Sequence, residues 1–330
     1  MSRLRTAFPG VIVARFPPIS ALQNVPGTSR SQSRPFRAHA PRVLVICKKS
    51  TYDSYFQERK GKRARAAGKS RNPAISRVLR AHQQHLRSVE QARKVLKELG
   101  AKAVFRCGGK PPSTDRFDLV FALGGDGTLL QASHLVGPGT PLVGINTAPI
   151  ASIGHFCAGT HCQMTDLIEM ALAGRLKQRR LSRMRVAVDG EIVSSRVLND
   201  ALFCHPYPSV TSRYVIELGK RREEQKSSGV WVGPAAGSTA AQLSAGGRAL
   251  PLCSQNLQFV VREPFKSGEK QLRIRRGLVR PGERLRIQSL MRAGRIYLDG
   301  PKLVRAVDFC STLQMSLSDE PLTLLGFVPA

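Results

Sequence analysis

The sequence predicts an α/β protein, with a doubly wound parallel sheet in the first part of the chain and an all-β domain after it. Three almost continuously apolar runs, at 42–47, 118–123 and 141–146, are typical of strands that helices cover on both faces. Helical patterns alternate with these runs, as in a Rossmann-like fold. After residue 184 the apolar runs shorten and are separated by Gly, Asp, Pro and Ser, which indicates a β-rich domain.

The first strand, at 42–47, lies between Pro41 and the segment Lys48-Lys49-Ser50. Open α/β sheets bind ligands at the carboxyl ends of their strands, so Lys48 is a candidate phosphate contact. A solvated charge at the end of a strand is the alternative interpretation.

Apolar residues at helical spacing predict a helix over 86–99, and Gly100 is a natural end for it. A strand is predicted at 103–105 and a last amphipathic helix over about 164–176. The strands expected in the second domain are 186–188, 192–193, 214–216, 230–232, 257–261, 285–287 and 296–298.

The composition is that of a globular chain. With 330 residues, 42% of them hydrophobic, two modest domains can each bury a core. No apolar run approaches the roughly 18 residues that a membrane-spanning helix needs, so we expect a soluble protein without a membrane partner. The seven cysteines are scattered and odd in number, which favours free thiols in a reducing compartment.

The formal net charge of +30 suggests polyanionic ligands. The excess is spread along the whole chain, aromatic residues make up only 6%, and no helix-turn-helix or zinc-finger spacing is present. We therefore expect no specific nucleic-acid partner, although weak adhesion to nucleic acid at low salt would follow from the charge.

Residues 1–40 contain many Arg, Ser and Pro and no Asp or Glu. This composition is typical of an organelle transit peptide, and a disordered basic tail or an upstream start codon are the alternatives. A cytoplasmic location is expected, or the mitochondrial matrix or another organelle if the segment is a transit peptide. A second basic stretch, 58–80, is predicted to be mobile or partly helical.

The strand at 118–123 ends in Gly124-Gly125-Asp126-Gly127-Thr128, which we call the glycine turn. Glycines without Cβ atoms let a phosphate or ribose approach the main chain, and Asp126 places a carboxylate at its centre. Thr128 is predicted to start a helix whose free N–H groups would bind phosphate. The alternative is a tight turn in which Asp126 only caps the helix.

The glycine turn resembles the signature of the NAD kinases and of their relatives, the diacylglycerol-type lipid kinases and the phosphofructokinases. Two later segments are similar to NAD kinases in particular: Leu198-Asn199-Asp200, and the small-residue loop 237–247 that begins Gly-Ser-Thr-Ala and ends Ser-Ala-Gly-Gly. The resemblance extends from about residue 42 to about 308, with 257–264 and Leu298-Asp299-Gly300 as supporting similarities.

This resemblance implies transfer of the terminal phosphate of ATP to the 2'-hydroxyl of the adenosine ribose of NAD or NADH. Asp126 would be the general base or would orient the hydroxyl. Mg²⁺ or another divalent cation is expected with ATP, without a protein cage of its own. The expected phosphate-binding residues are Gly124, Gly125, Gly127, Thr128 and Lys48.

The resemblance also implies a dinucleotide site in which Asn199 reaches the adenine and Asp200 a ribose. The residues expected around the adenine in the loop 237–247 are Ser238, Thr239, Ala240 and Ser244. An Asx turn is the alternative for Asn199-Asp200. The family more often has Glu than Asp at 200, Tyr at 241 and Asp at 228, and these departures bear on the choice between NAD and NADH.

The resemblance further implies that the ligand lies in a cleft between the domains and that the chain forms a homodimer or homotetramer. The expected divisions are a disordered basic extension at 1–40, an α/β nucleotide- and phosphate-binding domain at 41–160, a β-rich NAD-binding domain at 161–310, and a tail at 311–330 that packs back on the first domain.

Two other functions are weighed against this one. A lipid kinase would keep the glycine turn but lack the Asn-acid pair and the loop 237–247. A basic nucleic-acid-binding protein with an inactive kinase fold is the alternative from another class. A metal site at His155, Cys157, His161 and Cys162 is disfavoured, because zinc ribbons and fingers separate their ligand pairs by a loop.

Overall fold

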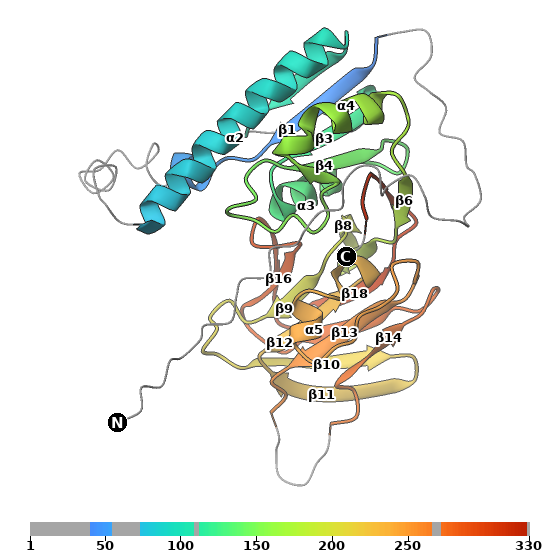
Figure 1. Ribbon diagram of the computed structural model, residues 1–330. Helices are drawn as coiled ribbons and strands as arrows, with labels where there is room; N and C mark the ends of the chain where they lie inside the picture. The colour runs from blue at the N-terminus through green and yellow to red at the C-terminus, as the bar shows by residue number, and fades with distance from the viewer. Residues whose placement is uncertain (1–39, 55–72, 109–111, 266–271, 329–330) are drawn as a thin grey trace, which may run out of the picture.

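The computed structural model describes residues 40–54, 73–108, 112–265 and 272–328 (Figure 1). An α/β domain lies above a β domain in this view, as the fold class predicts. The extension 1–39 and most of the basic stretch 58–80 lie outside the described residues.

The first sheet has seven strands, in the order β2-β1-β3-β4-β19-β6, with β5 beside β4. All pairs are parallel except β19 with β6. The strands are β1 (Arg42–Cys47), β2 (Lys102–Arg106), β3 (Leu119–Leu123), β4 (Leu142–Asn146), β5 (Gly159–Thr160), β6 (Gln178–Leu181) and β19 (Leu322–Leu325).

The strand order reverses between β1 and β3, because the chain runs outward from β1 to β2 and then returns to the other side. In open α/β sheets ligands bind at the carboxyl ends of the strands that flank such a switch point. Here those ends carry Lys48 and Gly124, and the Lys48 N–H donates to the Leu123 carbonyl at 3.0 Å. The fold therefore brings both predicted phosphate contacts to one place.

Helices cover both faces of this sheet. α2 (Pro73–Glu98) and α4 (Met164–Leu172) pack on one face, and α3 (Asp126–Leu135) packs on the other, facing the β domain (Figure 1). α2 starts earlier than the predicted 86–99, with proline in the first turn, where it costs no hydrogen bond. α4 ends at Leu172, before the predicted end near 176. Within the described residues, no helix is both long enough and apolar enough to cross a bilayer.

The β domain is a sandwich of two six-stranded antiparallel sheets around one apolar core. The first sheet has the order β11-β10-β15-β18-β7-β8, and the second β14-β13-β12-β9-β16-β17. The strands are β7 (Met184–Val188), β8 (Glu191–Val197), β9 (Ala201–Cys204), β10 (Ser212–Leu218), β11 (Arg221–Ser227), β12 (Gly229–Gly233), β13 (Leu257–Arg262), β14 (Arg276–Val279), β15 (Leu285–Ser289), β16 (Gly294–Leu298), β17 (Leu303–Val307) and β18 (Thr312–Leu317).

Sheet membership divides the chain differently from the expected boundaries at 160 and 310. α4 and β6 belong to the α/β domain, so the change comes after Leu181. β18 lies inside the sandwich, whereas β19 returns to the first sheet between β4 and β6. The part of the chain that packs back on the first domain is therefore the segment around β19 rather than the whole of 311–330.

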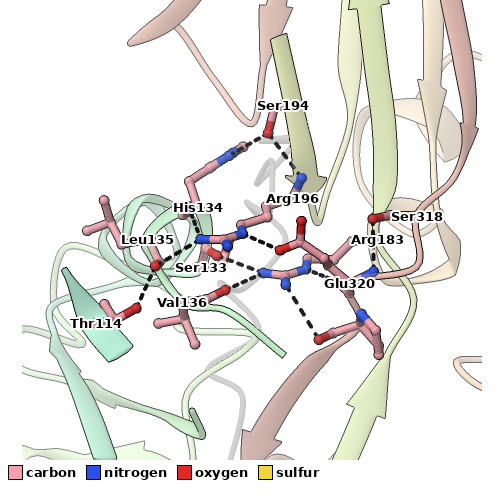
Figure 2. Close-up of polar contacts among 11 residues, drawn as sticks. Thr114, Ser133, His134, Leu135, Val136, Arg183, Ser194, Arg196, Ser318 and Glu320 are labelled. Carbon is pink, nitrogen blue, oxygen red and sulfur yellow. Dashed lines mark hydrogen bonds and ion pairs between the residues drawn. The ribbon is translucent and has the colours of Figure 1, made fainter. Parts of the chain in front are cut away.

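Two arginines from the start of the β domain hold the C-terminal end of α3 (Figure 2). The last carbonyls of a helix have no partner within the helix and need donors from elsewhere. Arg183, which is fully buried, donates to the Ser133 and Val136 carbonyls at 2.8 and 3.0 Å and also to the Glu320 and Pro321 carbonyls.

Arg196 of β8 completes this cap. Its Nη1 donates to the His134 and Leu135 carbonyls, and its Nε donates to the Glu320 carboxylate at 2.7 Å. Burial, and then the charge of Arg196, lowers the pKa of Arg183 to about 10, so Arg183 stays protonated at neutral pH. The cap thus fixes α3 to the β domain through main-chain atoms.

Replacing Arg183 tests this cap. Arg183→Met keeps an apolar stem but leaves four carbonyls without their donor, and each buried unsatisfied group costs about 1–3 kcal/mol. We expect the apparent free energy of unfolding to fall by at least roughly 3 kcal/mol in chemical denaturation. The matched control Arg185→Met, at an exposed position of β7, should change it by less than about 0.5 kcal/mol. Equal effects of the two substitutions would contradict the role of Arg183.

Candidate active site

The glycine turn connects β3 to α3, and three of its five N–H groups have no partner among the described residues. Gly124 donates to the Ile145 carbonyl at 3.0 Å, but the N–H groups of Gly125, Asp126 and Gly127 bond to no residue that the structure describes. A Cβ atom on Gly124 would collide with the Thr128 side chain, which explains the glycine there. Open N–H groups at the positive end of a helix form an anion-binding cradle.

α3 begins at Asp126, two residues before the predicted start at Thr128. The helix has no side-chain cap at Gly125, so Asp126 does not serve as the cap that the alternative interpretation required. Its carboxylate instead accepts N–H groups of Gly154, His155 and Phe156 at 3.1, 2.9 and 2.8 Å. A carboxylate has about four acceptor positions, so one remains for a ligand hydroxyl.

The loop that surrounds Asp126 is shaped by Asn146 at the end of β4. This fully buried amide donates to the Ser152 carbonyl at 2.9 Å and accepts the Ala148 N–H at 3.1 Å. Gly154 has a φ of +73°, and a Cβ there would lie 2.6 Å from the Asn146 amide nitrogen. The sequence marked Asn146 only as the end of a strand, so its shaping role was missed.

The four Cys and His residues at 155–162 do not gather into one site, although His161 Nε2 lies 3.5 Å from Cys162 Sγ. Cys157 is buried and its Sγ lies 3.8 Å from the Gly124 carbonyl, while His161 lies 2.9 Å from the Gln84 amide. Across the described ranges, no three His, Cys, Asp or Glu side chains come together to hold a metal ion.

Lys48 lies against the glycine turn, and its Cβ is 3.1 Å from the position that a Cβ on Gly124 would occupy. Burial lowers the pKa of Lys48. Its carbonyl is held by His85 Nε2 at 3.0 Å, and His85 Nδ1 contacts the Thr147 hydroxyl at 2.9 Å. Burial, and then the Lys48 charge, lowers the pKa of His85 to about 4. This imidazole is therefore neutral near pH 7 and holds the Lys48 carbonyl in place.

Asn199 and Asp200 follow β8 and are positioned by Asp299. The Asp299 carboxylate accepts the N–H groups of Leu198, Asn199 and Asp200 at 2.8, 2.7 and 3.0 Å. Its remaining contact is His134 Nε2 of α3, at 2.8 Å. The sequence pointed to Asp299 only through its resemblance, and the Asp-Gly pair at a strand end was the available signal.

Asp200 is an unusual acid because it is buried without a cationic partner among the described residues. Burial, and then the nearby Asp299 charge, raises its pKa from an ordinary value of 3.8 to about 7, while a hydrogen bond from the Asn199 amide at 2.8 Å acts in the opposite direction. The carboxyl is therefore close to half protonated at neutral pH.

The loop 237–247 packs against Asn199. A Cβ atom on Gly237 would overlap the Asn199 carbonyl, so only glycine permits this approach. Ser238 is fully buried, donates to the Ala235 carbonyl at 2.7 Å and accepts the Leu250 N–H at 2.8 Å. In this structure its hydroxyl shapes the loop, whereas Thr239, Ala240 and Ser244 are exposed.

One apolar cluster brings the three motifs together. It contains Leu129 and Leu130 of α3, Phe156 of the Asp126 loop, Leu198 before Asn199, and Ala236 before Gly237. The glycine turn, the Asn-acid pair and the loop 237–247 thus surround one core that both domains share.

A cavity of about 380 Å³ opens beyond Asp200 in the β domain. Its walls are mostly apolar, and its polar residues include Asp200, Ser228 and Arg262. The Arg262 guanidinium lies 5.9 Å from the Trp231 ring centre. Aromatic walls with few polar groups are typical of small-molecule sites.

A family model described as the ATP-NAD kinase N-terminal domain matches residues 51–175. A probable NADH kinase of Oryza sativa subsp. japonica is 34% identical over 226 residues, which cover 62% of this chain and 69% of that protein. The NADH kinase of Arabidopsis thaliana is 30% identical over 227 residues, which cover 62% of this chain and 71% of that protein.

Two solved structures share the fold. An NAD kinase from Archaeoglobus fulgidus, solved in complex with ATP, has a TM-score of 0.58 at 17% identity and covers 87% of this chain and 93% of its own. Yeast NADH kinase, solved with NADH, has a TM-score of 0.60 at 15% identity and covers 87% and 83%. At these identities the likeness shows the fold alone.

The raised pKa of Asp200 makes stability depend on pH. Between pH 3.8 and about 7 the folded chain keeps a proton that the unfolded chain has lost, so stability falls as the pH rises through this window. Asp200→Asn should match the parent near pH 4 and exceed its free energy of unfolding above pH 7 by roughly 2–4 kcal/mol. Denaturation at a series of pH values measures this difference, with exposed Asp319→Asn as the control. A difference that does not vary with pH would contradict the assignment.

Proposed function

The chain belongs to the NAD kinase family, and we propose that it transfers the terminal phosphate of ATP to the 2'-hydroxyl of the adenosine ribose of NAD or NADH. The observation that carries the proposal is the geometry at Asp126. One acceptor position of this fixed carboxylate stays available, beside three N–H groups that have no partner among the residues that the structure describes.

In this proposal the ribose hydroxyl donates to Asp126, which turns the hydroxyl oxygen toward the terminal phosphate and receives its proton. The N–H groups of Gly125, Asp126 and Gly127 face the phosphoryl oxygens, on which negative charge is spread during the transfer. Lys48 adds a positive charge at the same edge of the sheet. Little else is required of the protein, because phosphoryl transfer depends mainly on positioning and electrostatics.

A divalent cation such as Mg²⁺ is part of the proposal. No cage of three or more ligating side chains is found in the part of the chain that the structure describes, and Asp126 is mostly occupied by N–H donors. Mg²⁺ usually keeps few protein ligands beside substrate phosphates. The cation would therefore enter with ATP, where it neutralises phosphate charge.

The dinucleotide would lie along Asn199, Asp200 and the exposed part of the loop 237–247. The Asn199 amide suits an adenine edge, and the Asp200 carboxyl suits a ribose hydroxyl. Thr239, Ala240 and Ser244 supply hydroxyl groups and open space at the surface of the loop. Ser238 would act indirectly, by holding the loop in shape.

We also propose that NADH is the preferred acceptor, with its nicotinamide end in the cavity beyond Asp200. The nicotinamide ring is cationic in NAD and neutral in NADH. Arg262 lines this cavity, and Asp200 is only partly ionised near pH 7, so nothing there compensates a cationic ring fully. Glu263, which lies 3.7 Å from Arg262, is exposed and does not line the cavity.

A homodimer or homotetramer completes the proposal. Tyr207 and Val210 line the same cavity and are 67% and 44% exposed, so a second copy could cover them. Light scattering of the purified chain would measure the mass of the assembly.

Asp126→Asn tests the reaction. It keeps the side-chain shape but removes the proton acceptor, so we expect the turnover number to fall by about 10²–10⁴ while the fold is retained. Phosphate transfer from ATP would be measured with NAD, NADH and diacylglycerol as acceptors. Asp166→Asn, at an exposed position in the first turn of α4, is the control and should stay active. Undiminished turnover in Asp126→Asn, or a lipid as the best acceptor, would end this proposal.

Ser228→Asp tests the acceptor preference. An added carboxylate that attracts a cationic ring in a half-wet cavity contributes roughly 1–2 kcal/mol. We expect the ratio of kcat/KM for NAD to that for NADH to rise about tenfold, because tenfold corresponds to 1.4 kcal/mol. Ser228→Asn, which adds similar bulk without charge, should leave the ratio near that of the parent. If both variants shift it equally, size rather than charge sets the preference.

A further inference from the structure

Two of the seven cysteines, all of which are free, lie side by side at the carboxyl ends of β1 and β2, and β1 is the neighbour of β3, which leads into the glycine turn. β1 and β2 pair in parallel with Ile46 opposite Arg106, so the next residues along the strands, Cys47 and Cys107, are neighbours. Adjacent strands are about 4.8 Å apart. Disulfides form between residues whose Cα atoms are about 4.4–6.8 Å apart, so this spacing is suitable.

Both thiols point to the face of the sheet that α2 covers. Cys47 belongs to the same apolar cluster as Val45, and Phe105 packs against that cluster. Side chains two residues apart on a strand share a face, which places Cys107 with Phe105. The two thiols are within hydrogen-bonding contact, and the Arg93 guanidinium, stacked 4.0 Å from the Phe105 ring centre, is close enough to favour a thiolate at Cys47.

The two thiols differ in access. Cys107 is exposed, so a small oxidant can reach it, whereas Cys47 is buried. Burial, and then the hydrogen bond with Cys107, raises the pKa of Cys47. An exposed thiol that reacts first and a neighbouring thiol that resolves the product form the usual arrangement of a redox-sensitive pair.

We propose that Cys47 and Cys107 form a reversible disulfide when the protein meets a low-molecular-weight disulfide such as glutathione disulfide. The Cys107 thiolate attacks one sulfur of the oxidant, which releases the first glutathione thiolate and leaves a mixed disulfide. Cys47 then loses its proton to solvent and attacks Cys107 Sγ, which releases the second glutathione. Two protein thiols are oxidised and one glutathione disulfide is reduced to two thiols.

The disulfide would act on the site through Lys48, and this part of the inference rests on the proposed function. Lys48 follows Cys47 directly, donates its N–H to the Leu123 carbonyl and lies against Gly124. Tying Cys47 to β2 draws the end of β1 away from β3 and shifts Lys48 from the glycine turn. Small displacements of groups that position a substrate are costly in rate.

The test treats the full chain with glutathione disulfide, alkylates the remaining thiols under denaturing conditions and maps the peptides by mass. We expect one linked peptide pair that contains Cys47 and Cys107, and two fewer alkylated cysteines per chain. Activity should fall by about tenfold or more in step with the link, and dithiothreitol should restore both.

Matched variants separate the outcomes. Cys107→Ser, at an exposed position, should fold, keep its activity and resist glutathione disulfide, whereas Cys253→Ser, also exposed, should behave like the parent. Cys47→Ala and Cys47→Ser should both stop at the mixed disulfide on Cys107. The proposal would be overturned if the parent chain also stops at the mixed disulfide on Cys107 and Cys47 is recovered in its alkylated form.

Two further outcomes distinguish formation of the disulfide from its effect on the active site. Formation of the link without a loss of activity would overturn its effect on Lys48. A chain that is inactive when reduced but still forms the link would instead count against the proposed function, and the modification would stand.

Discussion

The arrangement of the site depends on the helix α3, which the β domain holds at its C-terminal end and which carries Asp126 at its other end. Arg183 and Arg196 cap the last carbonyls of this helix, so its position relative to the β domain is fixed through main-chain atoms. A helix of ten residues is stiff. Holding one end therefore also fixes the glycine turn at the other.

Two carboxylates, one in each domain, organise the main chain in the same way. Asp126 accepts three N–H groups from 154–156, and Asp299 accepts three from 198–200. Their surroundings differ, because His134 Nε2 of α3 lies 2.8 Å from the Asp299 carboxylate, whereas the fourth acceptor position of Asp126 is open among the described residues. This difference separates a carboxylate that can meet a substrate from one that only positions Asn199 and Asp200.

The sequence predicted what local chemistry determines. The apolar runs of β1, β3 and β4, the glycine turn and seven of the twelve strands described in the sandwich follow from residue patterns within a few positions of each other. The strands β9, β11, β14, β17 and β18 were not predicted, and β11, for example, is the charged segment Arg221–Ser227. Contacts between distant segments could not be predicted in this way. Arg183 is one of 52 Lys and Arg residues, and nothing beside it in the sequence marks it as buried. The return of β19 to the first sheet and the meeting of Cys47 with Cys107 likewise depend on strand order.

The two domains carry different parts of the site, which explains how the chain can differ from the family pattern at residues 228 and 241. The proposed proton acceptor Asp126 and the N–H groups proposed to bind phosphate belong to the α/β domain, whereas Ser228, Ala241 and Arg262 belong to the β domain. Asp200 connects the two groups of residues. It follows β8 and lines the cavity, and its N–H donates to Asp299, which also lies 2.8 Å from His134 of α3. Under the proposed function, substitutions in the cavity would therefore change which dinucleotide ring is accepted and leave Asp126 in place, because main-chain hydrogen bonds in the other domain hold its carboxylate.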